Sequence, residues 1–249
     1  MPEGDALHRA AARLQVLVGQ QVDVETPHPR AAVKRLPERL DGRRLESVEA
    51  VGKNLLLRFE GGLVLRSHLR MTGRWRVGRR GAASRGTPWL VLRGAEHEAV
   101  LWNGPVLELS RTPRVAVGPD LLAERFEPGA LAARLRAAGD VAVGEALLDQ
   151  RLVSGIGNLW RAEALWEAEV SPWDRVPTVS DERLQAVLTA ARRLMKASVA
   201  GARPARRVYR RVGRPCPRCG AAIRSHQQGE HARIAYWCPG CQGGGPGAP

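Results

Sequence analysis

The chain has 249 residues, 44% of them hydrophobic, with a formal net charge of +14 and a pI of about 11.1. This length and apolar content leave room for a sizeable core in two domains, with a small third element. No run approaches the roughly 18–20 apolar residues that cross a bilayer, and the start MPEGDALHRA lacks the pattern of a signal peptide. We therefore expect a soluble cytoplasmic protein that has no membrane partner. In a bacterium it would be found in the cytosol and nucleoid.

The positive charge is spread along the whole chain. Such a field attracts polyanions, of which nucleic acid is the most common. The charge alone does not establish a nucleic-acid partner, because an Arg- and Ala-rich chain can also be basic simply as a result of a GC-rich genome. Only three of the 39 basic residues are lysines, namely Lys34, Lys53 and Lys196, so a lysine inside a motif is notable here.

The N-terminal half predicts one helix followed by strands. Asp5 is expected to cap a helix whose apolar residues, from Ala10 to Val18, recur at i, i+3 and i+4. From about Val22 to Arg111, short and often alternating apolar runs are separated by turns that contain Gly and Arg. These runs cover 55–59, 63–69, 74–77, 89–94, 99–104 and 106–110. Six such strands predict an antiparallel sandwich or barrel.

Helices are predicted from Gly118 onward. One covers 144–153, two glycines interrupt it at 154–158, and a second covers 159–168. A longer amphipathic helix is expected over 180–200 behind Ser180 as its N-cap.

Together these patterns predict an α+β multidomain protein. The N-terminal part is an antiparallel β-sandwich with flanking helices, and the C-terminal part is helical with an appended ribbon. We expect a catalytic β-sandwich domain at 1–117, a helical domain at 118–204, a ribbon at 205–242 and a disordered tail at 243–249.

The strongest single motif is a pair of C-x-x-C sequences. Cys216 and Cys219 are followed, after eighteen residues, by Cys238 and Cys241. This spacing is typical of a ribbon that presents four thiolates to one zinc ion, with no coordination position left for catalysis. Cysteines confined to such a cluster also suit a metal site better than a disulfide framework. Arg233, between the two pairs, is either a solvated hairpin residue or a contact with the DNA backbone or a groove.

The sequence Ser154-Gly-Ile-Gly-Asn158 separates two predicted helices. Its glycines allow positive φ and let a phosphate approach the amides that begin the next helix. Asn158 can add a side-chain donor. Taken alone the motif is weak, because many helical hairpins turn on glycine.

The N-terminus carries candidate chemistry. Removal of Met1 leaves a free secondary amine at Pro2, and α-amino groups have pKa values of roughly 7.7–8, against about 10.4 for lysine. Such an amine is a nucleophile near neutrality and forms a charged iminium, the electron sink that elimination reactions need. Glu3 beside it can act as general acid and base. In isolation, a Met-Pro-Glu start is more often a simple lead-in to a helix.

Together these motifs resemble the formamidopyrimidine-DNA glycosylase/endonuclease VIII family over nearly the whole chain. The opening PEG resembles the endonuclease VIII branch, and this resemblance makes Pro2 the nucleophile at C1′ and Glu3 its assistant. VGKNLLL implies that Lys53 contacts the phosphate of the damaged strand and belongs to the catalytic set. SHLRMTGRW implies that Met71 fills the gap left by a flipped base and that His68 lies near a phosphate.

The C-terminal motifs extend the resemblance. LLDQRLVSGIGNLWRAEALW resembles the family's helix–two-turn–helix and gives Asn158 a phosphate-binding role, while RIAYWCPGC resembles its zinc finger and gives Arg233 a backbone-clamping role. The resemblance implies a bifunctional DNA glycosylase/AP lyase of base excision repair, which excises an oxidised base and cuts the strand by β,δ-elimination. It also implies one structural zinc as the only cofactor and a monomer that holds damaged duplex DNA in the cleft between its domains. Binding of single-stranded DNA is left open.

Two departures bear on the substrate. Family members commonly carry a second carboxylate where this chain has Ala6, so either Asp5 substitutes for it or that hydrogen bond is missing. The segment Met195–Tyr209 is short, whereas the 8-oxoguanine branch has a longer loop here that caps the purine. We therefore expect oxidised pyrimidines as substrates. The alternatives are an 8-oxoguanine/formamidopyrimidine glycosylase and a non-catalytic zinc-ribbon protein that only binds lesions; the preferred opposite base and any further void-filling residue stay open.

Overall fold

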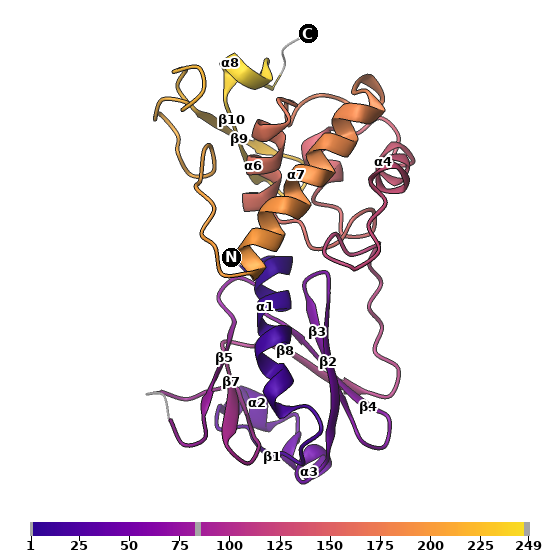
Figure 1. Ribbon diagram of the computed structural model, residues 1–249, viewed down its shortest axis with the longest axis vertical. Helices are drawn as coiled ribbons and strands as arrows, with labels where there is room; N and C mark the ends of the chain where they lie inside the picture. The colour runs from indigo at the N-terminus through magenta and orange to yellow at the C-terminus, as the bar shows by residue number, and fades with distance from the viewer. Residues whose placement is uncertain (1, 83–85, 247–249) are drawn as a thin grey trace. The chain divides into compact units, whose positions relative to one another are not determined.

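The computed structural model describes residues 2–82 and 86–246. The chain divides into two compact units, Met1–Val115 and Ala116–Pro249, and each is described by itself (Figure 1). The finer division into four regions, with a boundary at 204/205, remains a prediction, and residues 247–249 of the predicted tail lie outside the described residues. Within the described ranges, no helix has the length and apolar character needed to cross a membrane.

The first unit contains two four-stranded antiparallel sheets. One has the strand order β1-β6-β7-β5 and the other β2-β3-β4-β8. The strands are β1 (Asp23–Glu25), β2 (Leu45–Val51), β3 (Asn54–Phe59), β4 (Leu63–His68), β5 (Arg74–Arg79), β6 (Leu90–Arg93), β7 (His97–Trp102) and β8 (Val106–Ser110). Inward side chains of both sheets, such as Leu57 and Leu92, share one buried core, as expected where alternate residues of each strand face inward. The predicted β-sandwich is confirmed.

Helix α1 (Gly4–Leu14) covers strands β2 and β3 (Figure 1). Leu7, Ala10 and Leu14 lie three and four residues apart on one face and are buried in the same core. The N-cap position belongs to Glu3, so the expectation that Asp5 caps this helix was wrong. A short 3-10 helix (Gln15–Leu17) follows, and two four-residue helices, α2 (Pro29–Ala32) and α3 (Pro37–Leu40), complete the unit.

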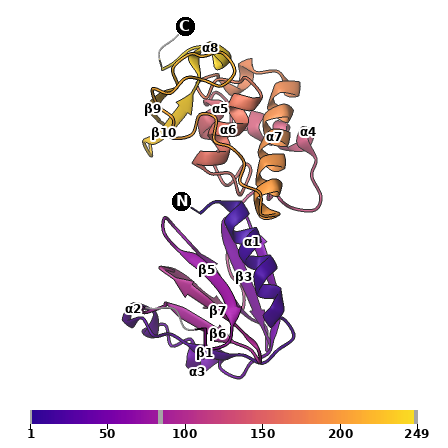
Figure 2. The ribbon, with the colours of Figure 1, turned by 60° about the vertical axis from the view of Figure 1, so that its left-hand side comes forward.

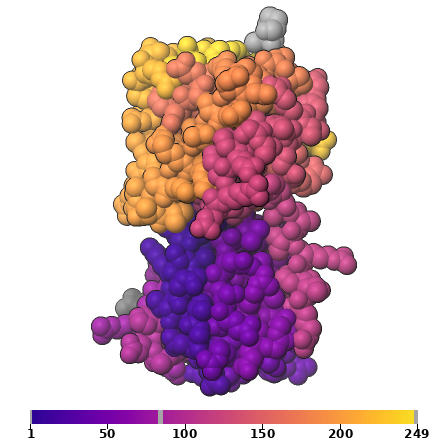
Figure 3. Space-filling view, turned by 45° about the vertical axis from the view of Figure 1, so that its right-hand side comes forward, coloured from indigo at the N-terminus to yellow at the C-terminus, as the bar shows by residue number. Residues whose placement is uncertain are grey.

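The second unit is helical and carries a small hairpin. Its elements are α4 (Pro128–Arg136), α5 (Val143–Ala146), α6 (Asn158–Glu167), a 3-10 helix (Val176–Thr178), α7 (Asp181–Val199), β9 (Arg224–Gln228), β10 (Arg233–Trp237) and α8 (Pro239–Gln242). Helix α7 packs against both α4 and α6, and the surface formed by the α4 and α7 segments is visible in Figure 3. Ser180 caps α7 as predicted, since its hydroxyl accepts a hydrogen bond from the amide of Arg183.

The helix predicted over 144–153 is much shorter in the structure. Helix α5 ends at Ala146, and hydrogen-bonded turns follow. The carboxylate of Asp149 accepts a hydrogen bond from the amide of Arg151 at 2.9 Å and pairs with its guanidinium at 2.7 Å. Such a local side-chain bond offers the backbone an alternative to the helix. This closes the turn before the glycine motif.

Candidate functional site

The predicted nucleophile and its neighbour begin the chain. Pro2 is half-buried, and the side chain of Glu3 is only 3% exposed at the N-cap of α1, where it forms no capping hydrogen bond. The carboxylate of Asp5 pairs with Arg9 one turn further on, at 2.9 Å. The side chain of Ala6 packs against the core. The fold thus places one buried carboxylate directly next to Pro2.

Lys53 and His68 lie close together because of strand register. The hairpin between β2 and β3 turns on Gly52 and Lys53, and Gly52 has φ of +59°, which favours glycine. Asn54, the next residue, pairs with His68 across β3 and β4. Both Lys53 and His68 are half-buried. Lys53 and His68, which were identified from two different sequence motifs, therefore belong to one site.

Burial and nearby positive charges both favour the neutral form of the His68 ring. Burial lowers the pKa of His68 from its ordinary value, and three positive charges lower it further; these are Arg70, Arg66 and Lys53. The Nδ1 atom of His68 accepts a hydrogen bond from the amide of Arg70 at 3.0 Å. A neutral ring that accepts at Nδ1 carries its proton on Nε2. His68 can therefore donate to an anion from Nε2 without being charged.

Met71 lies in the loop between β4 and β5 and is 59% exposed, which is unusual for so large an apolar side chain. The loop is closed by a bond from the amide of Gly73 to the carbonyl of Leu69. A Cβ atom at Gly73 would lie 2.5 Å from the Leu69 oxygen and 2.9 Å from the Asn103 oxygen. This close approach explains the glycine of the motif and holds Met71 at the surface.

Asn158 is the first residue of α6, behind a turn that Gln150 holds. The Oε1 of Gln150 accepts from the amide of Gly155 and its Nε2 donates to the carbonyl of Ile156, both at 3.0 Å. Gly155 has φ of +100°. Of the two glycines only Gly155 uses the positive φ that the sequence analysis expected, whereas Gly157 is the extended N-cap of α6 with φ of −124°, and Asn158 follows it as the first helical residue.

Arg233 begins β10, where it pairs with Gln228 of β9 and its side chain is exposed. The structure brings this hairpin to Asn158: the Nδ2 of Asn158 donates to the carbonyl of Ile234 at 2.8 Å. Helix α6 and strand β10 accordingly lie side by side (Figure 2). Asn158 and Arg233, 75 positions apart in the chain, are neighbours in the second unit.

The four cysteines converge as their spacing predicted. Their sulfur atoms all lie within 4.8 Å of one another, with Cys216 and Cys241 3.7 Å apart and Cys219 and Cys238 3.3 Å apart. A zinc ion with Zn–S distances of about 2.3 Å at the centre of a tetrahedron requires sulfur separations of about 3.8 Å. The separations exceed a disulfide bond length. The cluster therefore fits a tetrahedral metal.

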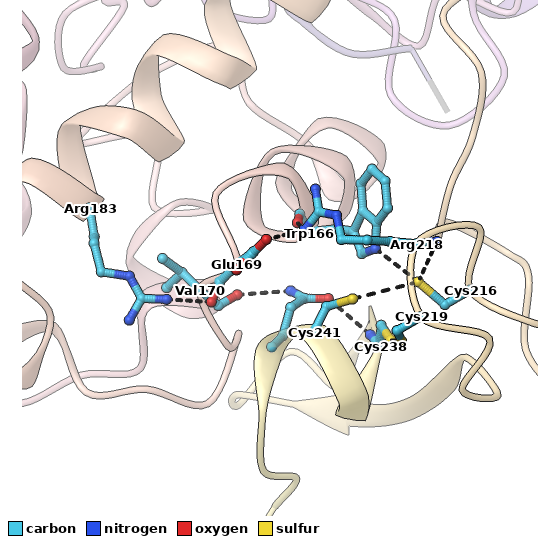
Figure 4. Close-up of polar contacts among 10 residues, drawn as sticks. Trp166, Glu169, Val170, Arg183, Cys216, Arg218, Cys219, Cys238 and Cys241 are labelled. Atoms are coloured by element: carbon cyan, nitrogen blue, oxygen red, sulfur yellow. Dashed lines mark hydrogen bonds and ion pairs between the residues drawn. The ribbon is translucent and has the colours of Figure 1, made fainter.

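The surroundings of Cys216 suit a thiolate ligand (Figure 4). Burial opposes ionisation, but hydrogen bonds from the amides of Arg218 and Cys219 and from the indole of Trp166 lower the pKa of the Cys216 thiol to about 6. The guanidinium of Arg218 covers the Trp166 ring at 4.3 Å and pairs with Glu169. The knuckle is thereby attached to the end of α6.

Both units of the chain match models of one family. Residues 1–105 match the formamidopyrimidine-DNA glycosylase N-terminal domain, and residues 117–207 match the formamidopyrimidine-DNA glycosylase H2TH domain. "Probable endonuclease 8 2" of Streptomyces coelicolor is 38% identical, with 98% of this chain and 95% of the relative covered. "DNA-(apurinic or apyrimidinic site) lyase Nei2" of Mycolicibacterium smegmatis is 36% identical, with coverage of 97% and 99%.

The chain belongs to the formamidopyrimidine-DNA glycosylase/endonuclease VIII family. The predicted family and class of enzyme, a DNA glycosylase with AP lyase activity, are thereby confirmed. The fold agrees as well: Lactococcus lactis Fpg, solved in complex with DNA that contains an abasic site, superimposes with a TM-score of 0.81 at 24% identity, covering 96% of this chain and 99% of that one.

Two residues of this family member escaped the sequence analysis. Arg161 is 1% exposed and binds the Asn158 side chain. Glu163 is 4% exposed and accepts hydrogen bonds from the amides of residues 207, 208 and 209. Burial raises the pKa of Glu163, and these bonds oppose the rise. A charged residue in a helix ordinarily indicates a solvated face, so the sequence alone gave no sign that either one was buried.

Proposed function

We propose that this enzyme excises oxidised pyrimidines from DNA and then cuts the strand, with Pro2 as its nucleophile. The observation that carries the proposal is the Pro2–Glu3 pair, in which a buried carboxylate lies directly beside the residue that becomes the N-terminus when Met1 is removed. A secondary amine and a general acid/base in adjacent positions suffice for glycosidic displacement followed by elimination. No metal ion is needed for these steps.

The reaction begins when the damaged nucleotide leaves the stack, at a cost of a few kcal/mol that is smallest at damaged sites. The Pro2 nitrogen forms a bond to C1′ as the bond from C1′ to the base breaks, and the departing base takes up a proton. Loss of the proton from the Pro2 nitrogen then lets the C1′–O4′ bond break, with O4′ taking up a proton, and the iminium formed at C1′ of the opened sugar acidifies the C2′ proton. Loss of that proton expels the 3′ phosphate, and a second elimination expels the 5′ phosphate. Glu3 moves protons at the reacting sugar.

The other site residues hold the DNA. Lys53 supplies a cation and His68 a neutral Nε2 donor beside it, and both suit phosphate oxygens. The exposed Met71 side chain fills the space from which the nucleotide has flipped. In the second unit, Asn158 and Arg233 contact phosphates, while Cys216, Cys219, Cys238 and Cys241 hold one structural zinc ion that maintains the hairpin. We expect the enzyme to act as a monomer on damaged duplex DNA.

Arg233→Ala is expected to weaken binding of lesion DNA about tenfold and to lower the slope of log K against log salt by about one unit, because one charged phosphate contact is lost. Equilibrium titrations of a duplex with a reduced abasic site, over about 50 to 200 mM salt, measure both quantities. Arg224→Ala is the matched control, since it removes the same charge at the opposite end of the hairpin, where Arg224 pairs with Trp237. Equal changes in both variants would contradict a specific contact at Arg233.

The preference for pyrimidines rests on the connection after α7. This helix ends at Val199, and by residues 207–209 the chain is already bound to Glu163 of α6. The segment between Val199 and residue 207 therefore has few residues that could surround a flipped base. A purine-specific pocket needs further backbone donors around the larger ring, whereas a saturated pyrimidine stacks poorly and leaves the helix at lower cost.

Thymine glycol, dihydrouracil and 5-hydroxypyrimidines are therefore expected to be excised faster than 8-oxoguanine opposite cytosine. Single-turnover rates on duplexes of matched sequence, with enzyme in excess, measure the difference without interference from product release. Faster removal of 8-oxoguanine would reverse the assignment of the substrate and leave the chemistry of Pro2 untouched.

A further inference from the structure

One buried guanidinium joins four segments of the second unit. Arg161 of α6 donates from Nη1 to the carbonyl of Gly144 at 3.1 Å and to Oε1 of Gln228 at 3.0 Å. From Nη2 it donates to Oδ1 of Asn158 at 2.5 Å and to the carbonyl of Ile234 at 3.0 Å. These acceptors belong to α5, β9, the start of α6 and β10, which lie together in Figure 2.

The burial of Arg161 makes these bonds strong constraints. Its side chain is 1% exposed, and a guanidinium removed from water must be compensated by hydrogen bonds that it donates to its neighbours. Hydrogen bonds from a charged donor are shorter and stronger than neutral ones. The positions of the four acceptors are therefore coupled to one another through Arg161.

The same guanidinium fixes the orientation of the Asn158 amide. A guanidinium only donates, so it can face the oxygen of an amide but not its nitrogen. With Oδ1 on Arg161, one hydrogen of the Nδ2 group binds the carbonyl of Ile234 at 2.8 Å, the same oxygen that accepts from Nη2 of Arg161. That bond uses one of the two Nδ2 hydrogens, and the amide has a second with which it can donate to a phosphate.

We propose that Arg161 is a positioning residue for DNA binding. It sets the direction of the Asn158 donor by holding both the Oδ1 atom of that side chain and the Ile234 carbonyl to which its Nδ2 group donates. A neutral phosphate contact is thus aligned by a residue that touches no DNA. The inference rests on the proposed function, in which Asn158 binds a phosphate.

A double-mutant cycle tests the inference on the full-length protein. Arg161→Met, Asn158→Ala and the double variant are titrated against a duplex with a reduced abasic site. Each single variant is expected to bind about tenfold more weakly, the loss typical of a hydrogen bond to a charged group. The double variant should bind no more weakly than Arg161→Met, because the two residues act through one contact. Arg193→Met, which removes an exposed arginine paired with Glu167, is the control and should bind like wild type.

Salt dependence separates positioning from direct contact. Arg161→Met should keep the wild-type salt slope in spite of its weaker binding, whereas a direct phosphate contact would lower the slope by about one unit. A lowered slope, or fully additive losses in the cycle, would overturn the inference and leave the proposed function standing. Wild-type affinity of Asn158→Ala would instead remove the Asn158 contact from the proposed function, and the inference with it.

A spectroscopic readout on the wild-type protein covers the case in which Arg161→Met does not fold. The chain has three asparagines, Asn54, Asn103 and Asn158, so labelling of asparagine with ¹⁵N gives three side-chain amide pairs, and Asn158→Ala assigns one. The Asn158 amide is expected to be as rigid as the backbone without DNA, as judged by its heteronuclear NOE, and one of its hydrogens should shift when the duplex is added. A mobile amide in the free protein would overturn the inference.

Discussion

A variant with additional residues left in front of Pro2 is expected to lose base excision and strand cleavage by at least about a thousandfold, since loss of an enzyme's nucleophile costs several orders of magnitude in rate. The extension converts the amine of Pro2 into an amide, which has no nucleophilic lone pair, and leaves every side chain in place. Single-turnover cleavage of a thymine glycol duplex measures the effect.

The matched control is the same fusion after proteolytic removal of the extension directly before Pro2. Its activity should return to that of the wild type. Equal activity of the extended and trimmed proteins would contradict the role of Pro2, whereas inactivity of both with normal DNA binding would favour the non-catalytic alternative.

Cys238→Ser is expected to abolish stoichiometric zinc and to weaken binding of lesion DNA about a hundredfold, since the phosphate contacts of both Arg233 and Asn158 depend on the hairpin. Cys238 directly follows β10 and is fully buried within the cluster. Metal binding and folding are coupled in such small modules, so loss of one ligand removes the order of the strand that carries Arg233.

Metal analysis of the purified protein and titration with DNA measure the two effects. Ser225→Ala, on the same hairpin but outside the cluster, should keep both zinc and affinity. At saturating enzyme, the single-turnover excision rate of Cys238→Ser should remain close to that of the wild type, because the metal supports binding and takes no part in the chemistry. A wild-type protein without stoichiometric zinc would contradict the tetrahedral site.

The sequence predicted those parts of the molecule that local patterns determine. The six strands between residues 54 and 110 follow from alternation and turn residues, and the cysteine cluster follows from the spacing of its ligands. The long helix α7 follows from its amphipathic period and its Ser180 cap. Each of these signals lies within a short stretch of sequence, where propensity and periodicity are informative.

The features that the sequence did not predict depend largely on contacts between residues far apart in the chain. The acceptors of Arg161 in the hairpin are 67 and 73 positions away along the chain, and no local pattern reveals that they meet at a buried guanidinium. The helix predicted over 144–153 failed because the Asp149 carboxylate binds the amide and side chain of Arg151, which favours a turn. His68 was assigned by resemblance, but its pKa is lowered first by burial, which only the fold produces, and then by the charges of its neighbours Arg70 and Arg66 and of Lys53.

The most direct test of the account is to locate the covalent bond between enzyme and DNA. Borohydride reduction during reaction with an abasic-site duplex should trap the iminium, and mass spectrometry of the digested adduct should find the sugar on the N-terminal peptide that begins with Pro2. Attachment to the peptide that contains Lys53, or the absence of any adduct in an enzyme that still cleaves the strand, would contradict it.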